Sequence, residues 1–120
     1  MQFDVERATV AGRPSLTVRG ELDLSTAPRL ETDAEQLLGS SRDFVVDLTH
    51  TTFLDSSGAR SLLRLAKQAE TAGIAMHVLA PRSNGPVRLT LDLLDLGAYM
   101  QVVASAGEIT LRLVDGDAGT

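Results

Sequence analysis

Residues 44–58 read FVVDLTHTTFLDSSG, and the two patterns in this stretch decide which fold the chain can adopt. Phe44–Leu48 is almost continuously apolar, which is typical of a strand buried on both faces of a parallel sheet. A polar connection, Thr49–Thr52, leads into Phe53-Leu54. The small polar residues of Asp55–Gly58 then mark the start of a helix. A buried strand followed directly by a helix indicates an α/β domain.

The flanking sequence repeats this alternation of strands and helices. Alternating apolar residues predict strands, and apolar residues at helical spacing predict amphipathic helices. We expect strands at 3–6, 16–20, 44–48, 74–79 and 99–103, and helices at 25–38, 55–72 and 84–96. The turn Ala11–Pro14 makes the first two strands an antiparallel hairpin, and three strand–helix–strand units require parallel strands. The predicted order is β-β-α-β-α-β-α-β.

A further element is expected after the last strand. Ser105 and Glu108 have the spacing of a capping box, which favours a short helix. The alternation within 109–114 favours a strand equally well, so both remain open. We predict one domain over residues 1–114 and a polar tail at 115–120.

Composition excludes several classes of function. The chain has 120 residues and no cysteine, which rules out disulfides, thiolate zinc sites and a cysteine nucleophile. A net charge of −5 and only four aromatic side chains (three Phe, one Tyr) argue against nucleic-acid binding. No apolar run approaches the ~20 residues of a membrane span, and Met1–Glu6 lacks the features of a signal peptide. We expect a cytoplasmic protein that needs no cofactor or metal.

Asp55–Gly58 is the segment best placed to carry function. It follows a strand at the carboxyl end of the sheet, where sites of open α/β folds gather. The amino terminus of a helix has unpaired N–H groups and a partial positive charge, so a phosphate on a serine there need not unfold the domain. Gly58 leaves room for close approach of another backbone or a phosphate. The simpler interpretation is a serine that only caps the helix.

Two separated motifs resemble one known family. Asp55-Ser56-Ser57-Gly58, with the preceding Phe44–Leu48 and Thr52–Leu54, resembles the signature of the STAS domain family, and in particular its bacterial anti-sigma-factor antagonists. Gly20–Asp23 after the second strand is similar to a second hallmark of that family. Ala80-Pro81 and the helix that ends at Leu94–Leu96 look like its third-helix region. The resemblance runs over roughly residues 3 to 112 and implies a STAS-like (SpoIIAA-like) mixed β-sheet with helices packed on it.

The resemblance also implies a mechanism. The unmodified antagonist binds an anti-sigma factor with GHKL-type serine kinase activity and thereby releases a sigma factor. Phosphorylation of the second serine, here Ser57, ends the interaction, and a PP2C-type phosphatase restores it. The residues implied in partner binding are Asp23, Asp55, Ser56, Gly58, Glu21, Thr26, Leu54, Ala59 and Arg60.

The sequence departs from the family pattern just after this motif. Ala59 is smaller than the aliphatic residue usual at its position. Arg60, Ser61 and Arg64 give the following helix a basic, polar character. Because Arg60 lies three residues after Ser57 and four before Arg64, all three can share one face. These arginines could pair with an acidic partner, pair with the phosphate, or simply face solvent.

Other functions are weaker interpretations of the same residues. Within the family, the chain could be a scaffold or lipid-transport accessory subunit whose serine is never phosphorylated. From another class, Ser57 could be the nucleophile of a small hydrolase. However, it lacks a Gly-x-Ser-x-Gly context. Its base would have to be His50, in a connection, or His77, predicted to be half-covered on a strand.

Aspartates at strand ends also raise the question of a magnesium-binding receiver domain. Such a domain needs a lysine at a late strand end, and the one lysine, Lys67, falls inside a predicted helix. We therefore do not predict a metal site at Asp23, Asp47 and Asp55, and we expect Asp47 to pair locally. Asn84-Gly85-Pro86 is interpreted as a turn that opens the third helix.

Overall fold

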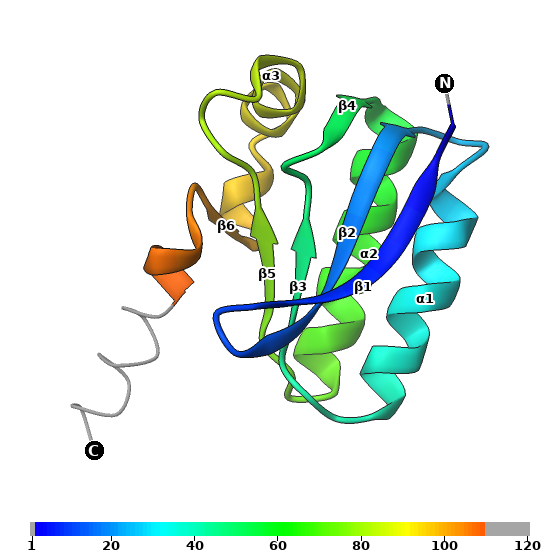
Figure 1. Ribbon diagram of the computed structural model, residues 1–120, viewed down its shortest axis with the longest axis vertical. Coiled ribbons are helices and arrows are strands. Elements are labelled where there is room, and N and C mark those ends of the chain that lie inside the picture. Colours follow the sequence, from blue (N-terminus) through cyan, green and yellow to red (C-terminus); the bar gives the residue numbers. More distant parts are fainter. Residues whose placement is uncertain (1, 110–120) are drawn as a thin grey trace.

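The computed structural model describes residues 2–109 and has the predicted α/β architecture (Figure 1). Its strands and helices alternate along the chain as expected, with one additional strand. The elements are β1 Asp4–Val10, β2 Arg13–Leu22, α1 Ala27–Gly39, β3 Phe44–Asp47, β4 Thr51–Leu54, α2 Ser56–Thr71, β5 Met76–Leu79, α3 Gly85–Leu93, the 3₁₀ turn η1 Leu96–Ala98, and β6 Gln101–Val103.

The sheet is mixed, as the hairpin and the crossovers require. Its strand order is β1-β2-β3-β5-β6, with β4 paired to β2 beside this path. β1 and β2 are antiparallel, whereas the other pairs are parallel. Helices α1 and α2 lie side by side on one face of the sheet (Figure 1). The carboxyl ends of the parallel strands therefore meet at one end of the molecule.

The strand that the sequence did not predict is β4. We expected a polar connection through Thr52, but Thr51–Leu54 is a strand. Strand β3 pairs only with the first half of β2, at Ser15–Thr17, so the second half of β2 is open to another partner. β4 fills it, with Leu54 opposite Leu22. A threonine can be buried here because the Thr51 hydroxyl donates a 2.8 Å hydrogen bond to the carbonyl of Val18.

Asn84 holds the break between β3 and β4 in place. Its side-chain amide donates to the carbonyl oxygens of Leu48 at 3.0 Å and Thr51 at 2.8 Å. Its side-chain oxygen caps α3 by accepting from the N–H of Val87 at 3.5 Å. The turn predicted at this position is thus also a link between α3 and the sheet.

The core is aliphatic, as the shortage of aromatic residues implies. Phe44 is the one fully buried aromatic side chain among the described residues, and leucine and valine supply most of the remaining core. A second, smaller cluster lies apart from the main one. It consists of Val45, Leu79, Val103 and Ile109. Both faces of the central strands β3 and β5 are therefore covered.

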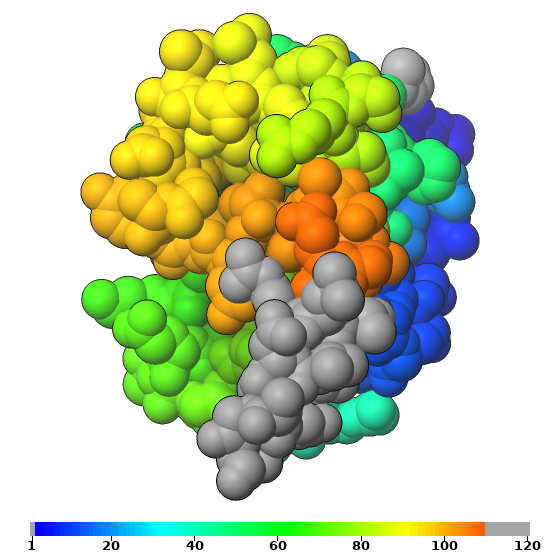
Figure 2. Space-filling view, turned by 90° about the vertical axis from the view of Figure 1, so that its left-hand side faces the viewer, coloured from blue at the N-terminus to red at the C-terminus, as the bar shows by residue number. Residues whose placement is uncertain are grey.

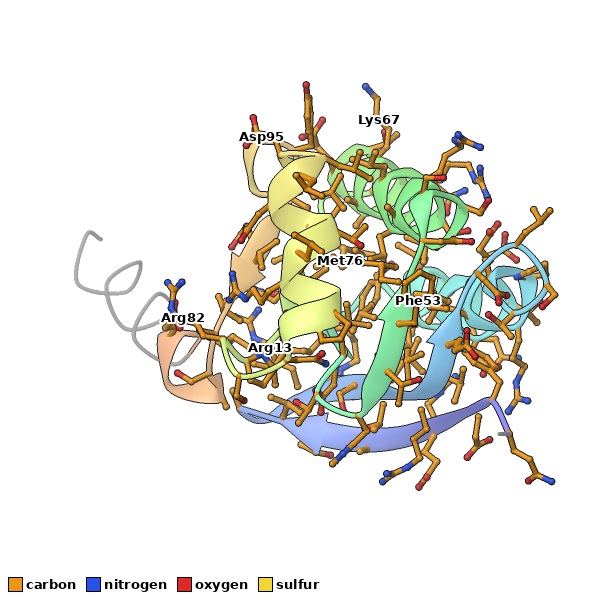
Figure 3. All side chains as sticks on the ribbon, turned by 90° about the horizontal axis from the view of Figure 1, so that it is seen from above. Arg13, Phe53, Lys67, Met76, Arg82 and Asp95 are labelled. Atoms are coloured by element: carbon orange, nitrogen blue, oxygen red, sulfur yellow. The ribbon has the colours of Figure 1, made fainter. Side chains whose placement is uncertain are left out.

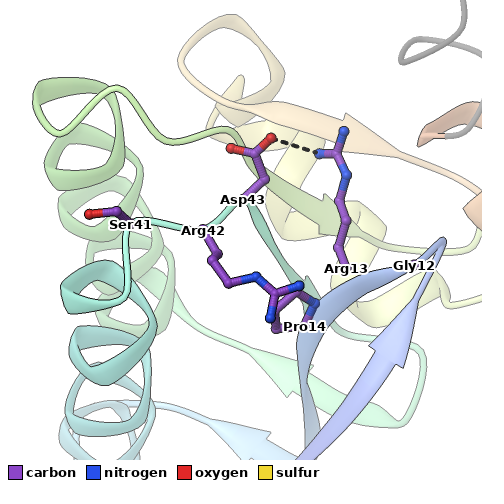
Figure 4. Close-up of a pocket in the computed structure, with 6 residues that line it drawn as sticks. All are labelled: Gly12, Arg13, Pro14, Ser41, Arg42 and Asp43. Atoms are coloured by element: carbon purple, nitrogen blue, oxygen red, sulfur yellow. Dashed lines mark ion pairs between the residues drawn. The ribbon is translucent and has the colours of Figure 1, made fainter.

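His77 lies on β5 opposite Val45, the strand partner that belongs to this second cluster. It is 3% exposed, so the prediction of a half-covered residue is wrong. Its Nδ1 lies 3.2 Å from the guanidinium of Arg13. Arg13 also forms an ion pair with Asp43 at 4.0 Å, at the rim of a pocket on the amino-terminal side of β3 (Figure 4). This part of the sheet is the end opposite to the predicted functional site.

The side of the molecule seen in Figure 2 is formed by α3, η1, β6 and part of α2. A shallow hollow lies between η1 and α2, lined by Ala66, Glu70 and Tyr99 among others. Leu89 and Leu93 of α3 and Tyr99 after η1 are exposed. No helix within residues 2–109 is long and apolar enough to cross a bilayer.

Glu108 makes the hydrogen bond that the predicted capping box requires of its side chain. The Glu108 carboxylate accepts from the backbone N–H groups of Ala104 at 2.8 Å and Ser105 at 3.1 Å. A helical turn begins at residue 106. The choice between helix and strand for 110–114 and the predicted tail at 115–120 lie outside the described residues.

We predict that Asn84→Ala lowers the free energy of unfolding by about 1–3 kcal/mol, because two carbonyls lose a donor and α3 loses its cap. Asn84→Asp keeps an acceptor for the helix but has no amide donor, and it places a carboxylate against two carbonyl oxygens. It is expected to be destabilised at least as much at pH 7. Urea unfolding of both variants measures this, and a wild-type stability for Asn84→Asp would contradict the proposed link.

Candidate functional site

Two loops predicted to carry function lie next to each other at the carboxyl end of the sheet. The segment Glu21–Thr26 comprises the end of β2 and the loop after it, and Asp55–Gly58 follows β4. Because β2 and β4 are paired through Leu22 and Leu54, their next residues emerge side by side. The N–H of Asp55 donates to the carbonyl of Leu22 at 3.3 Å. Figure 3 views the molecule from above, with Phe53 of β4 labelled.

Asp55, not a serine, caps helix α2. Its carboxylate accepts a 2.8 Å hydrogen bond from the N–H of Gly58. The simpler interpretation, that a serine serves only as the cap, is therefore wrong. Ser56 is exposed and Ser57 is half-buried. Within residues 2–109 the Ser57 hydroxyl has no hydrogen-bond partner, so it contributes none to the helix start.

Gly58 brings the first turn of α2 against the end of β2. A Cβ atom at this position would lie 2.4 Å from the Leu22 carbonyl oxygen and 2.9 Å from the Leu54 side chain. The close approach predicted for Gly58 is confirmed, and the group that approaches is the backbone of β2. Any larger residue would push α2 away from the strand and separate the two loops.

Asp23 organises the first loop through its carboxylate. It accepts from the Ser25 hydroxyl at 2.9 Å, from the Ser25 N–H at 3.0 Å and from the Thr26 N–H at 3.1 Å. These bonds, that of the Ser25 hydroxyl first, lower the pKa of Asp23 against the opposing effect of burial. Its negative charge is therefore fixed within the loop.

Thr26 stands at the amino-terminal cap position of α1, but its hydroxyl does not cap that helix. It accepts from the Asp23 N–H at 2.9 Å and donates to the Glu21 carbonyl at 2.7 Å. Its role is to close the loop that carries Asp23.

A polar network joins α2 to α1 one turn beyond Ser57. The buried Ser61 hydroxyl donates to the Glu31 carboxylate, which also accepts from Arg64 at 2.8 Å. These contacts, that of Ser61 first, lower the pKa of Glu31 although burial raises it. The network borders a small pocket of about 100 Å³, lined by Leu24, Ala27, Pro28, Glu31, Ser57, Arg60, Ser61 and Arg64.

The predicted partner-binding residues separate into two groups. Asp23 and Asp55 line one hollow together, whereas Ser57 and Arg60 line the other pocket. Glu21 and Ser56 are exposed. By contrast Leu54, Gly58 and Ala59 are buried, Leu54 at 0% and Ala59 at 1% exposure, so these three residues are not at the surface. They support the two loops from below.

Sequence reasoning missed two apolar residues at this site. Leu24 is 75% exposed and borders both hollows, and Phe53 is 45% exposed on β4. A single leucine inside a polar loop gives a weak signal. Phe53 follows the polar connection predicted from the sequence, and only the structure shows that it is exposed on a strand.

The alternative chemistries find no support in the described residues. His77 is buried beside Arg13, and neither it nor the exposed His50 is bonded to Ser57. Asp47 accepts hydrogen bonds from the N–H and the hydroxyl of Thr49, as the predicted local pairing requires. No group of three or more potential metal ligands occurs within residues 2–109.

The chain combines a mixed sheet, two helices on one face of it and an Asp-Ser-Ser-Gly turn whose aspartate caps the second helix. Residues 5–109 match the STAS domain family, and the chain belongs to this family. Curated protein sequences give no significant match.

Solved structures with the same fold include three bacterial proteins. A Thermotoga maritima protein proposed to be an anti-sigma factor antagonist is 16% identical, with a TM-score of 0.77 and 90% and 92% of the two chains covered. An anti-sigma factor antagonist of Mycobacterium paratuberculosis is 21% identical, with a TM-score of 0.73 and 95% of each chain covered. The phosphorylated Bacillus cell fate determinant SpoIIAA is 19% identical, with a TM-score of 0.61 and coverage of 93% and 99%.

We predict that Gly58→Ala destabilises the protein by more than about 2 kcal/mol, because the new methyl group meets a backbone oxygen that cannot move alone. Helix propensity alone predicts the opposite, since alanine is favoured over glycine by about 1 kcal/mol. The matched control is Gly39→Ala at the end of α1, where a Cβ atom meets nothing within 4 Å. Equal unfolding free energies for the two variants would contradict the close contact.

The Glu31 network predicts a pH dependence. Because the folded pKa of Glu31 is lowered, its stabilising effect is complete above its ordinary pKa and is lost as the pH falls through the lowered value. Ser61→Ala removes the largest cause of that lowering. The loss of stability in Ser61→Ala should therefore be greater at pH 7 than at pH 3, as measured by urea unfolding. A difference that grows towards pH 3 would reverse the sign and refute the assignment.

Proposed function

We propose that this protein is an anti-sigma factor antagonist: it binds an anti-sigma factor through the end of the sheet that carries Ser57, and phosphorylation of Ser57 ends the binding. The kinase is the anti-sigma factor itself, with a GHKL-type ATP site, and a PP2C-type phosphatase reverses the modification. The protein acts as a binding module in the cytoplasm and not as an enzyme.

One observation carries the proposal. Asp55 caps helix α2, which leaves the half-buried Ser57 hydroxyl without a hydrogen-bond partner in the described part of the chain. Ser57 is therefore free to be modified at a helix start whose N–H groups and dipole tolerate negative charge. The modification need not disturb the cap or the contact between Gly58 and Leu22.

The surface around Ser57 supports binding of another protein. Leu24 and Phe53 supply exposed apolar area, and Asp23 and Glu21 supply negative charge beside it. Apolar side chains surrounded by polar groups are the usual composition of a protein interface. The loops that present them are held by paired strands, so little ordering is needed on binding.

Phosphorylation can end such an interaction through charge alone. The γ-phosphoryl group of ATP would pass to the Ser57 oxygen: an oxygen–phosphorus bond forms, the bond to ADP breaks, and the hydroxyl proton leaves. The product adds about −1.5 to −2 charge next to Asp23 and Asp55. Each tenfold loss of affinity corresponds to about 1.4 kcal/mol, which a desolvated like charge readily supplies.

We expect incubation with the cognate kinase-type anti-sigma factor and ATP to add about 80 Da to the protein. Ser57→Ala should abolish this gain and retain binding, whereas Ser56→Ala should still be modified. Intact-mass spectrometry measures both. A binding partner without any mass gain would favour the unmodified scaffold instead, and ester hydrolysis lost in Ser57→Ala would favour a hydrolase.

The apolar part of the surface can be tested separately. Leu24→Ala should weaken binding of the anti-sigma factor by about 1–2 kcal/mol, roughly 5- to 30-fold, because an exposed leucine loses its buried contact. Leu93→Ala on α3 is the matched control, since that leucine is 74% exposed against 75% for Leu24. Isothermal titration calorimetry gives both affinities. Equal affinities for the two variants would place the interface elsewhere.

A further inference from the structure

Ser57 shares its pocket with two arginines that follow it on α2. The pocket of about 100 Å³ lies between α1 and α2, with Arg60 and Arg64 on the α2 side and Glu31 on the α1 side. Arg60 lies three residues after Ser57, so the two side chains project from the same face of the helix. A phosphate on Ser57 would therefore meet cationic groups within its own domain.

The two arginines are not equivalent. Arg64 already donates to the Glu31 carboxylate at 2.8 Å and to the Ser61 hydroxyl at 3.2 Å. Arg60 is exposed and makes no hydrogen bond or ion pair with any residue of the described chain. A new anion in the pocket can recruit Arg60 without breaking an existing contact, whereas recruiting Arg64 would leave Glu31 without its cation.

The charges on either side of Ser57 decide where a phosphate would turn. Asp23 and Asp55 line the hollow on one side, and a dianion there would face two carboxylates. On the other side Glu31 is the one carboxylate in the pocket lining, and Arg64 already compensates its charge. Repulsion by Asp23 and Asp55 and attraction to Arg60 both favour a position of the phosphate in the pocket beside Arg60.

We infer that phosphorylated Ser57 forms an ion pair with Arg60 of the same chain. The inference rests on the proposed phosphorylation of Ser57. Guanidinium and phosphate are well matched, because the planar fork can donate two hydrogen bonds to phosphate oxygens. Phosphorylation would then change the binding surface in two ways. It would add negative charge, and it would hold Arg60 so that this cation no longer contacts the partner.

The test uses the full 120-residue chain with phosphoserine encoded genetically at position 57, so that no kinase is required. The second ionisation of a phosphoserine ordinarily has a pKa of about 6. Phosphorus NMR across a pH titration should show that pKa lowered, and Arg60→Gln should raise it by about half a unit. Arg60→Lys should retain part of the lowering, because the charge is kept and the fork is lost.

The control is Arg42→Gln, an exposed arginine at the pocket on the opposite end of the sheet (Figure 4). It should leave the phosphate pKa unchanged. The same pKa in wild type and Arg60→Gln would overturn the inference, as would a shift in Arg64→Gln alone. Helix N–H groups also lower the phosphate pKa, but they are present in every variant and cancel in the comparison. Because the phosphate is installed without a kinase, these outcomes are independent of whether any kinase modifies Ser57.

Discussion

The backbone contact between Gly58 and Leu22 is the constraint on which the site depends. A Cβ atom at Gly58 would lie 2.4 Å from the Leu22 carbonyl oxygen, which also accepts the N–H of Asp55. The end of β2 and the start of α2 are therefore joined without intervening side chains. This junction sets the distance between the loop of Asp23 and the turn of Ser57, and it places acidic groups on one side of the serine and arginines on the other.

In this domain, the residues that support the two loops are different from the residues that form their exposed surface. Leu54 and Ala59 are buried under the two loops, whereas Leu24, Ser56 and Arg60 are exposed above them. Exposed residues can change with little effect on stability. Related domains can therefore keep the same fold and acquire different partners. Shared topology at 16–21% identity in the three solved structures is consistent with such a division.

Much of the fold could be predicted because helical and strand periodicities are local properties of the sequence. Strand β4 could not, since the short TTFL segment becomes a strand only when the open half of β2 pairs with it. The burial of His77 depends in the same way on what packs over the second face of the sheet. At the site, the small polar residues of Asp55–Gly58 indicated the turn, and the family resemblance implied the roles of Asp23 and Ser57. The choice of Asp55 as the cap and the pairing of Arg64 with Glu31 required three-dimensional distances.

The hydrogen bonds around Asp23 and Glu31 determine how the charge of this surface responds to pH. Their lowered pKa values keep both carboxylates ionised at every pH that a living cell normally reaches. The charge they contribute is thus constant while Ser57 is unmodified. A phosphate on Ser57, whose second pKa is ordinarily about 6 and would be lowered here by Arg60, would bring to this place a group that takes up a proton on acidification. Covalent modification would then make this part of the surface sensitive to intracellular acidification.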